Sequence, residues 1–338
     1  MMTTKTTNNF VLAIGIVFAL GATSIFVLCM VLFSAEPESF IITNGVVEGE
    51  VTTKEFTKDS AVQFRHLQKT QAYYDFDVDL LSVDAAELVD AKTGDVLLKK
   101  NAFTQHSLAS LSKLVTTLFL FERGFIYSAE SQVTPQTIDQ GIRAYDIPIS
   151  LSSPISKITV TKPEMFLAQD LLSATLIASA NNAAFALVGS QGLTEPAFQQ
   201  AIESYLKEKG FNATTLLDPA GLHPGDVSTA DEYAQLALRA FSYADIRATT
   251  TTPSADMSSK SSSTRIHVHT TDRLLDSRSQ EILGGKTGYL DEAQYNFVVL
   301  TRHASGRELL LVMLGADSSD QRFIESNQII DWANQSLK

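Results

Sequence analysis

The chain has a single cysteine among its 338 residues, and its basic side chains are fewer than its acidic ones. Cys29 lies inside an apolar segment, so the rest of the protein has no thiol and no disulfide can form there. Lysine and arginine number 26 against 38 aspartates and glutamates, which gives a formal net charge of −12. Nucleic-acid binding requires a basic surface, so this composition argues against nucleic acid as a partner.

Residues 10–33 form a long apolar run that carries no charged side chain over 24 residues. This length is sufficient for a helix to cross a bilayer, whereas the apolar region of a cleaved signal peptide usually has only about 7–15 residues. We therefore expect a transmembrane anchor, with a cleaved signal and a secreted body as the alternative. Lys5 precedes the run and Glu36 follows it, so the positive-inside tendency predicts a short cytoplasmic tail at residues 1–9.

The remaining chain divides into a polar segment and one large domain. Residues 36–80 are mixed and polar, and we predict a stalk or linker there, with one or two extra strands packed on the body as the alternative. Residues 81–338 are long enough for a single domain with its own core.

Patterns typical of strands occur near both ends of this domain, and helical patterns fill its middle. Residues 87–98 predict a hairpin that turns at Lys92-Thr93-Gly94, and further strands are predicted at 281–288, 294–302 and 308–315. The two ends must therefore meet in one antiparallel sheet, which helices cover and into which a helical block is inserted. The predicted fold class is α+β.

Helical periodicity predicts helices at about 111–124, 194–210, 229–241 and 323–333. Thr161-Lys162-Pro163-Glu164 has the pattern of a capping box with an early proline, which predicts a further helix from residue 161 through Leu176. Residues 249–264 are polar and low in complexity, which predicts a flexible loop or hairpin tip.

Three short motifs occur in order and far apart in this domain. Ser110 and Lys113 form Ser-x-x-Lys, Ser179 and Asn181 form Ser-x-Asn, and Lys286-Thr287-Gly288 follows. Each motif alone is weak, but the ordered set is the signature of serine acyl-transferring enzymes that bind penicillin.

Second copies of two motifs show why the order matters. Lys92-Thr93-Gly94 precedes the serine motif and has the composition of a turn, so we interpret it as structural. Ser204 and Lys207 lie inside a predicted helix after Ser-x-Asn, so we expect them at the surface.

The residue types of the three motifs suit acyl transfer. A serine hydroxyl becomes a good nucleophile only when a base removes its proton, and residues three apart on a helix share a face, so Lys113 is placed to act on Ser110. A lysine serves as a base only when it is neutral. Burial and a nearby cation, for which Lys286 is the candidate, would lower its pKa toward that state.

The other motif residues suit substrate binding. Ser179 is suited to relay a proton to the leaving group, and the Asn181 amide to bind a substrate backbone. Lys286 on an edge strand is suited to bind a carboxylate, and Gly288 leaves room for a substrate along that strand. The purely structural interpretations are a helix-capping loop for Ser179 and Asn181 and a strand-end lysine for Lys286.

Beyond these motifs, the chain resembles the serine-type D-alanyl-D-alanine carboxypeptidases, the low-molecular-mass penicillin-binding proteins. The likeness covers about Ala85 to Ala333 and includes ASLSKLVT, LLSATLIASANNAAFAL, LLDPAGLHPGDVSTADEYAQLA and GGKTGYLDEAQYNFVVL. It implies a five-stranded antiparallel sheet flanked by helices, with an inserted helical subdomain. It also implies a bacterial cell membrane as the location, peptidoglycan stem peptides ending in D-Ala-D-Ala as substrates, and β-lactams as covalent inhibitors.

The resemblance also implies a role for each motif residue. Ser110 would be the acylated nucleophile, Lys113 its base, and Ser179 a proton shuttle. Asn181 and Gly288 would accommodate the substrate, and Lys286 and Thr287 would bind its terminal carboxylate. The backbone N–H groups of Ser110 and Tyr289 would form the oxyanion hole.

Other functions stay open at the level of sequence. A D,D-endopeptidase that cuts peptide cross-links would use the same residues. A β-lactamase of the same superfamily would need a carboxylate base after Ser-x-Asn, for which Glu195 and Glu203 are the nearest candidates, although both fall in a helical pattern. A membrane-tethered protein that binds the cell wall without turnover would be indicated by a missing catalytic residue, and none is missing. No cofactor is implied, and we expect no metal, because His267 and His269 share a strand face but lack further ligands.

Overall fold

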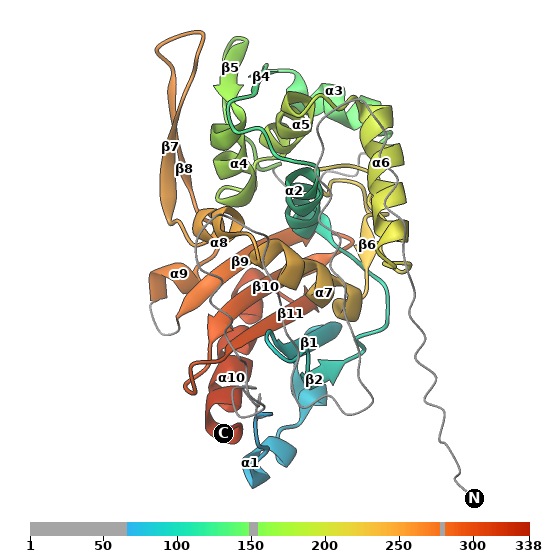
Figure 1. The fold of residues 1–338 in the computed structure, drawn as a ribbon, viewed down its shortest axis with the longest axis vertical. Coiled ribbons are helices and arrows are strands. Elements are labelled where there is room, and N and C mark those ends of the chain that lie inside the picture. Colours follow the sequence, from blue (N-terminus) through green and yellow to red (C-terminus); the bar gives the residue numbers. More distant parts are fainter. Residues whose placement is uncertain (1–65, 149–154, 278–280) are drawn as a thin grey trace, which may run out of the picture. The chain divides into compact units, whose positions relative to one another are not determined.

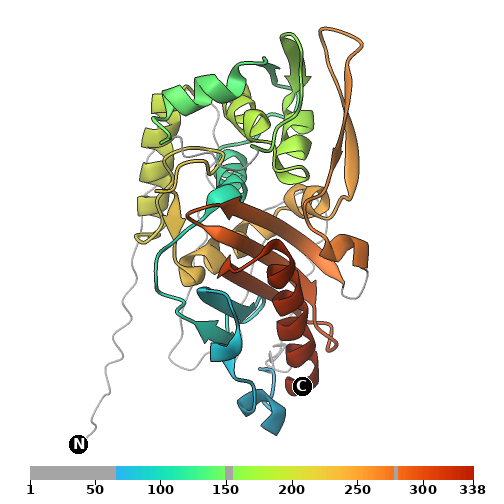
Figure 2. The same cartoon turned by 180° about the vertical axis from the view of Figure 1, so that it is seen from behind.

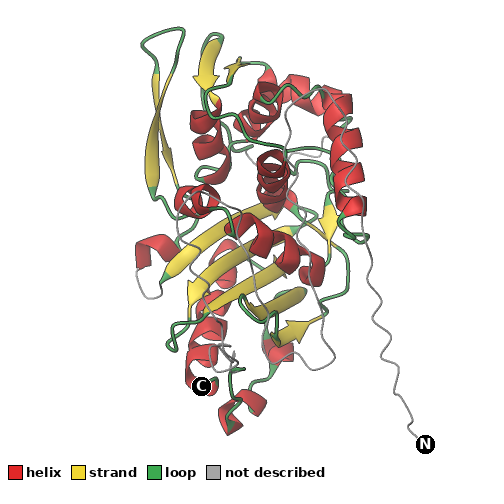
Figure 3. Ribbon diagram, in the orientation of Figure 1, coloured by secondary structure: helices red, strands yellow, loops and turns green. Residues whose placement is uncertain are grey.

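The computed structural model describes residues 66–148, 155–277 and 281–338. This part of the chain is built on a five-stranded antiparallel sheet with the strand order β2-β1-β11-β10-β9 (Figures 1 and 3). The strands are β1 (Ala85–Asp90), β2 (Val96–Lys100), β9 (Ile282–Leu290), β10 (Gln294–Arg302) and β11 (Glu308–Ala316). The prediction that strands from both ends of the domain share one antiparallel sheet is confirmed.

Side chains alternate between the two faces of the sheet and belong to two separate cores. On β10, Val298 and Leu300 pack in the core on the side of the helical block, while Phe297 and Val299 pack under the C-terminal helix α10 (Ser319–Ser336). All four are buried, because helices cover both faces. Figure 2 shows α10 against one face of the sheet, and Figure 1 shows α7 (Ala230–Phe241) on the opposite face.

The helical block lies between β2 and β9 in the sequence. Its helices are η3 (Ala109–Leu111), α2 (Ser112–Glu122), α3 (Thr137–Ala144), α4 (Ala168–Leu176), α5 (Asn181–Ser190), α6 (Glu195–Glu208), α7, α8 (Ala244–Thr250) and α9 (Leu274–Ser277). The predicted helices at 111–124, 194–210 and 229–241 are confirmed as α2, α6 and α7. Three short strand pairs also occur among the described residues of this region: β3 (His106–Ser107) with β6 (Val227–Ser228), β4 (Glu130–Val133) with β5 (Glu164–Leu167), and β7 (Ser254–Ser258) with β8 (Arg265–His269).

Helix α2 is the centre of this block. Every residue from Ser112 to Phe121 is buried. The Phe119 ring meets the rings of Phe198 and Tyr205 on α6 edge to face, with centroids 5.9 and 5.5 Å apart. The helix that follows the serine motif is therefore held on all sides, which gives the motif a rigid support.

The described residues before β1 pack on the body. They form α1 (Gln71–Tyr74) and η2 (Val78–Leu80). The Tyr73 ring lies 5.2 Å from the Trp332 ring of α10, and the Tyr73 hydroxyl donates to the Leu97 carbonyl at 2.7 Å. The linker prediction for 36–80 therefore does not apply to residues 66–80, because burial of aromatic surface holds them on the domain.

Among the described residues, no helix combines the length and the apolar character that a membrane crossing requires. The predicted tail at 1–9, the predicted anchor at 10–33 and the first part of the predicted stalk lie outside the described residues.

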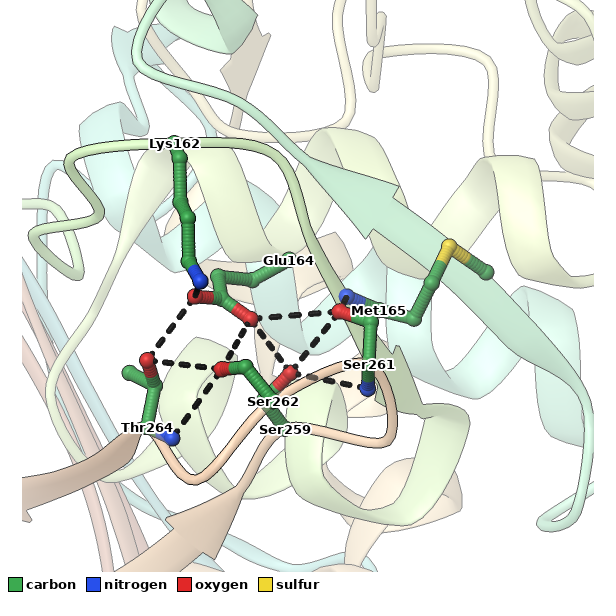
Figure 4. Close-up of polar contacts among 7 residues, drawn as sticks. All are labelled: Lys162, Glu164, Met165, Ser259, Ser261, Ser262 and Thr264. Carbon is green, nitrogen blue, oxygen red and sulfur yellow. Dashed lines mark hydrogen bonds and ion pairs between the residues drawn. The ribbon is translucent and has the colours of Figure 1, made fainter.

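The helix predicted from residue 161 begins later, at Ala168. Glu164 lies in β5, which pairs with β4. Its carboxylate accepts hydrogen bonds from four hydroxyl groups at the tip of the hairpin formed by β7 (Ser254–Ser258) and β8 (Arg265–His269), as Figure 4 shows. The capping-box prediction is wrong, because partners distant in sequence bind the carboxylate and strand pairing sets the backbone.

The same contacts explain the polar segment 249–264. The predicted hairpin tip is present at residues 259–264, between β7 and β8. The loop prediction is wrong for much of residues 249–258, because Thr249 and Thr250 end α8 and residues 254–258 form β7. Ser259, Ser262 and Thr264 donate to Glu164 at 2.5, 2.7 and 2.8 Å, and the Lys260 N–H donates to the Met165 carbonyl at 2.7 Å. These hydrogen bonds, with that from Ser259 the largest effect, lower the pKa of Glu164 to about 2. We call the side-chain hydroxyl groups around the charged Glu164 carboxylate the hairpin clasp; they belong to Ser259, Ser261, Ser262 and Thr264.

Candidate active site

Ser110 lies in η3, the short turn that leads into α2. The preceding residue, Ala109, has φ +48°, a left-handed conformation that is costly for a residue with a Cβ. Neighbouring elements hold this turn from two sides. The Asn296 side chain on β10 donates to the Leu108 carbonyl at 3.0 Å, and the Leu108 N–H donates to the Asp226 carbonyl at 2.7 Å. The serine is therefore presented on a backbone that cannot relax locally.

Lys113 lies one turn after Ser110 and reaches its hydroxyl. The Lys113 Nζ is 2.7 Å from Ser110 Oγ and 2.6 Å from Asn181 Oδ1, and it also donates to the Ala220 carbonyl. Asn181 Oδ1 and the Ala220 carbonyl can only accept, so they take two N–H groups of Lys113. The Ser110 hydroxyl can accept the third proton of an ammonium group or donate its own proton to a neutral amine. The predicted pairing of Ser110 with Lys113 is present, and Asn181 joins the same group of contacts.

The Lys113 side chain is completely buried. Burial lowers the pKa of Lys113 to about 7, against the opposing effect of the Asp218 and Asp226 carboxylates. A large fraction of Lys113 is therefore neutral near pH 7, as a general base requires.

The Ser-x-Asn motif connects α4 to α5. Ser179 has φ +56°, and Asn181 begins α5. The side-chain nitrogen Nδ2 of Asn181 donates to the Ser156 carbonyl at 3.0 Å, which turns the side-chain oxygen Oδ1 toward Lys113. The predicted position of this motif, between the end of one helix and the start of the next, is confirmed.

Lys286 lies on β9, which is an edge strand of the sheet as predicted. Its Nζ donates to Ser179 Oγ at 2.8 Å and to the Thr287 carbonyl at 2.9 Å. Burial, followed by the positive charges of Lys113 and Arg322, places the pKa of Lys286 well below its ordinary value. We expected burial and a nearby cation to lower the pKa of Lys113 together. Burial is the main cause, as expected, whereas the charge of Lys286 is not among the main contributions.

Thr287, Gly288 and Tyr289 continue along β9 past the nucleophile. A Cβ placed on Gly288 would lie 2.8 Å from the Leu108 carbonyl oxygen and 3.3 Å from the Ser110 nitrogen. The glycine thus allows β9 and η3 to approach backbone to backbone. As a result, the two segments that carry the Ser110 and Tyr289 amides, expected to form the oxyanion hole, are neighbours.

A cleft of about 210 Å³ lies over these residues. Six of the predicted site residues line it, namely Ser110, Ser179, Asn181, Thr287, Gly288 and Tyr289. Lys113 and Lys286 are buried at the back of the site and reach it through Ser110 and Ser179. The three motifs are therefore assembled around one cleft.

The structure also brings charged residues to the site that we did not predict, among them Asp291 and Glu292, which line the cleft. Arg322 of α10 lines the cleft and donates to the Gly288 carbonyl at 3.1 Å. Burial, followed by the charge of Arg273, lowers the pKa of Arg322 to about 10. Asp218 lies buried near Lys113. Arg322 carries no motif signal, whereas Asp218 stands in the LLDPAGL segment, which was part of the resemblance.

The second motif copies lie away from the site. Lys92, Thr93 and Gly94 form the turn between β1 and β2, and Gly94 has φ +74°. Ser204 and Lys207 are exposed on α6. Both structural interpretations are confirmed.

The residues weighed for other chemistry also lie elsewhere. Glu195 and Glu203, the candidates for a β-lactamase base, are exposed on α6 and do not line the cleft. His267 and His269 lie on β8 with ring centroids 4.3 Å apart, and His267 Nδ1 is 2.6 Å from Asp256 Oδ1. Within the described ranges, no group of three or more potential metal ligands occurs.

Comparison with known proteins adds a family to this geometry. The family model described as D-alanyl-D-alanine carboxypeptidase matches residues 75–318. A D-alanyl-D-alanine endopeptidase of Pseudomonas aeruginosa is 24% identical over 254 residues, which cover 75% of this chain and 77% of that protein. The D-alanyl-D-alanine carboxypeptidase DacF of Bacillus subtilis is 26% identical over 253 residues, which cover 74% of this chain but only 61% of that protein.

Solved structures share the fold. Penicillin-binding protein D2 from Listeria monocytogenes, in a cefotaxime-bound form, is 25% identical, with a TM-score of 0.61 over 75% of this chain and 97% of that one. The DD-transpeptidase of Streptomyces K15 is 20% identical, with a TM-score of 0.64 over the same shares.

Proposed function

Because the chain belongs to the D-alanyl-D-alanine carboxypeptidase family, we propose that it is a serine D,D-peptidase that hydrolyses peptidoglycan stem peptides ending in D-Ala-D-Ala. The observation that carries this proposal is the 2.7 Å contact between a buried lysine of lowered pKa and the Ser110 hydroxyl. The contact lies beside a cleft that contains Ser179 and Asn181. A nucleophile, its base and a proton relay are thus present together.

In the proposed acylation step, neutral Lys113 takes the proton from Ser110 Oγ while Oγ bonds to the carbonyl carbon of the penultimate D-alanine. The Ser110 and Tyr289 amides stabilise the resulting oxyanion, a contribution of several kcal/mol in enzymes that use such donors. The Ser179 hydroxyl passes its proton to the leaving amine and takes one from Lys286, whose Nζ already donates a hydrogen bond to Ser179 Oγ. The C–N bond then breaks, the terminal D-alanine departs, and water later hydrolyses the Ser110 ester.

Substrate binding uses the positive end of the cleft. We assign Lys286 and Thr287 to the terminal carboxylate: Thr287 lines the cleft, and the buried Lys286 acts through its charge from behind Ser179. Arg322, which also lines the cleft and donates to the Gly288 carbonyl, adds positive charge there. Asn181 holds the peptide backbone, and Gly288 lets the substrate pass close to the strand. The same groups would hold the carboxylate of a β-lactam, which we propose as a covalent inhibitor of Ser110.

A D,D-endopeptidase is the second candidate, because two relatives with that name are matched over 77% and 76% of their own length, whereas the carboxypeptidase DacF is matched over 61%. The two activities differ in the leaving group, a free D-alanine in one case and a cross-linked strand in the other. Incubation of the enzyme with a D-Ala-D-Ala pentapeptide and, separately, with cross-linked muropeptides distinguishes them by the products released.

We also propose that residues 10–33 anchor the enzyme in a bacterial membrane with the catalytic domain outside. The 24 uncharged residues support this placement. A secreted body produced by signal cleavage is the alternative. In intact cells, protease added outside should release an active soluble fragment, whereas a mature protein that begins near Glu36 and is free in the medium would contradict the anchor.

The central experiment is mass spectrometry of the protein after incubation with a β-lactam and with the pentapeptide. We expect a covalent adduct on Ser110 with the former and loss of one D-alanine from the latter. Ser110→Ala should abolish both, and the matched control Ser204→Ala should leave both intact. Labelling that survives Ser110→Ala would refute the proposed nucleophile.

A further inference from the structure

Asp218 is a completely buried carboxylate behind the cleft, in the turn formed by residues 218–223. Its Oδ1 accepts the N–H groups of Ala220 and Gly221 at 2.6 and 2.9 Å. Its Oδ2 accepts those of Leu222 and His223 at 2.9 and 2.7 Å. Four backbone donors satisfy one side chain, so the conformation of this turn depends on the Asp218 carboxylate.

The turn touches both the base and the nucleophile. The Ala220 carbonyl accepts a hydrogen bond from Lys113 Nζ, and the Pro219 carbonyl accepts one from the Thr116 hydroxyl of α2 at 3.1 Å. Gly221 has φ +72°, and a Cβ placed on it would lie 1.8 Å from the Ala109 carbonyl oxygen, immediately before Ser110. The Asp218 turn therefore fits directly against the backbone that presents the serine.

Asp218 also carries the charge that faces Lys113. Its neighbour Asp226 is equally buried, and Asp226 Oδ1 accepts hydrogen bonds from the Leu217 N–H at 2.7 Å and the Asp218 N–H at 3.4 Å. The Ser112 side chain also hydrogen-bonds the Asp226 carboxyl, so two backbone donors and one hydroxyl serve Asp226, against four backbone donors for Asp218. Burial, and then the Asp218 charge, places the pKa of Asp226 well above its ordinary value. Burial also raises the pKa of Asp218, but its four donors favour the ionised form. We therefore assign the proton to Asp226 and the negative charge to Asp218.

Other elements contribute three titratable groups around Lys113 and Asp218. Tyr145, which follows α3, is neutral, since burial and then the charges of Glu195 and Asp218 raise its pKa. Lys286 of β9 faces Lys113 as a second buried lysine. Tyr233 of α7 is neutral, since burial raises its pKa, and its hydroxyl donates to the Leu111 carbonyl at 3.0 Å. Asp218 is thus the ionised carboxylate that acts on Lys113, whereas the buried Asp272 is the carboxylate that acts on Lys286.

We propose that Asp218 is a positioning residue for the serine chemistry: it fixes the 218–223 turn against Ser110 and Lys113, and its charge sets how readily Lys113 releases its proton. This inference rests on the proposed serine mechanism. Asp218 itself does not line the cleft and need not touch the substrate. Its effect is transmitted through the Ala220 carbonyl, the Gly221 contact and the electrostatic attraction to Lys113.

The test compares two variants that separate charge from geometry. The second-order rate constant for acylation by a fluorescent penicillin is measured from pH 5 to 10 for the wild type, Asp218→Asn, Asp218→Glu and the exposed control Asp139→Asn. Asp218→Asn removes the charge that stabilises the Lys113 ammonium, so the rising limb of the profile should move to lower pH by about one unit. It also loses charge-assisted hydrogen bonds to the turn, so the plateau should fall by about 10- to 100-fold.

Asp218→Glu keeps the charge but lengthens the side chain, so it should lower the plateau and leave the limb near its wild-type position. The limb position does not depend on the fraction of folded enzyme, so partial unfolding does not obscure it. The inference would be overturned if Asp218→Asn and the wild type had the same plateau rate and the same pH for the rising limb. It would also be overturned if Asp218→Asn had a lower plateau rate but an unshifted rising limb, because that result indicates a purely structural role. Absence of acylation in the wild type would instead refute the proposed function itself.

Discussion

A single methyl group on Gly288 tests whether the close approach of β9 to η3 matters for catalysis. In Gly288→Ala the new Cβ would lie 2.8 Å from the Leu108 carbonyl oxygen, with the Leu111 and Ser110 nitrogens both at 3.3 Å. All three neighbours are backbone atoms, so no side chain can rotate away. Asn296 and Asp226 hold the η3 side, so the edge strand β9 is the element that must move.

The required movement is small but falls at the reacting centre. Ordinary contacts of this kind begin near 3.4 Å, so β9 must withdraw by about 0.6 Å. This displacement carries the Tyr289 amide away from Ser110. Misplacement by 1 Å costs about 100-fold in rate, so we expect acylation to slow by about 10- to 30-fold, or roughly 1.4–2 kcal/mol. Lys113 does not contact Gly288, so the pH at which the rate rises should not change.

The assay is acylation by a fluorescent penicillin, combined with thermal unfolding of the same samples. Gly288→Ala should lower the unfolding free energy by about 1 kcal/mol, the low end for overpacking, because an edge strand can yield. The matched control is Gly189→Ala in α5, where an added Cβ would meet only Ser131 Oγ, at 3.5 Å. This control should acylate normally and gain up to ~1 kcal/mol of stability from helix propensity. Wild-type acylation and stability in Gly288→Ala would refute the reasoning.

The remaining predictions concern the base, the sheet and the hairpin clasp. The acylation rate of the wild type should rise with pH through about 7, as Lys113 loses its proton, and a profile that is flat between pH 5 and 9 would contradict its assignment as base. Burial, with a further contribution from Asp231, raises the pKa of Glu87 in β1 from 4.5 to about 7, against the opposing charge of Lys99. Folding favours the neutral form of Glu87, so the stability that this form contributes is fully present below pH 4.5 and is lost as pH rises through 7. In thermal unfolding, the unfolding free energy of Glu87→Gln should therefore exceed that of the wild type by up to ~3 kcal/mol at pH 8 and differ little from it at pH 4. Glu164→Ala removes the acceptor of the clasp, so hydrogen exchange at the Lys260 amide should accelerate, while the exposed control Glu203→Ala should leave it unchanged; equal protection in both variants would show that the hairpin tip does not depend on the carboxylate.

The sequence by itself determined which segments form the terminal strands and three of the helices, and which motif residues belong to the site. It did not give the strand order of the sheet or the presence of Arg322 and Asp218 at the site. Alternating and helical patterns are local properties, so the terminal strands and helices α2, α6 and α7 could be predicted before any contact was known. Ser110 and Lys113 are three residues apart on one turn, so their hydrogen bond follows from helix geometry. The ordered motifs then indicated which distant residues should meet, because few serine chemistries need that set.

Only the tertiary structure decided the distances between those residues and the shifts of their pKa values. Lys113 and Asn181 are 68 positions apart and Ser179 and Lys286 are 107 apart, so their distances depend on how helices pack over the sheet. Burial lowers the pKa of Lys113, and burial is a property of the assembled core rather than of a motif. The capping box at Glu164 failed for the same physical reason. Its carboxylate bonds to hydroxyls about 100 residues away, and a local pattern cannot reveal a partner that folding brings from that distance.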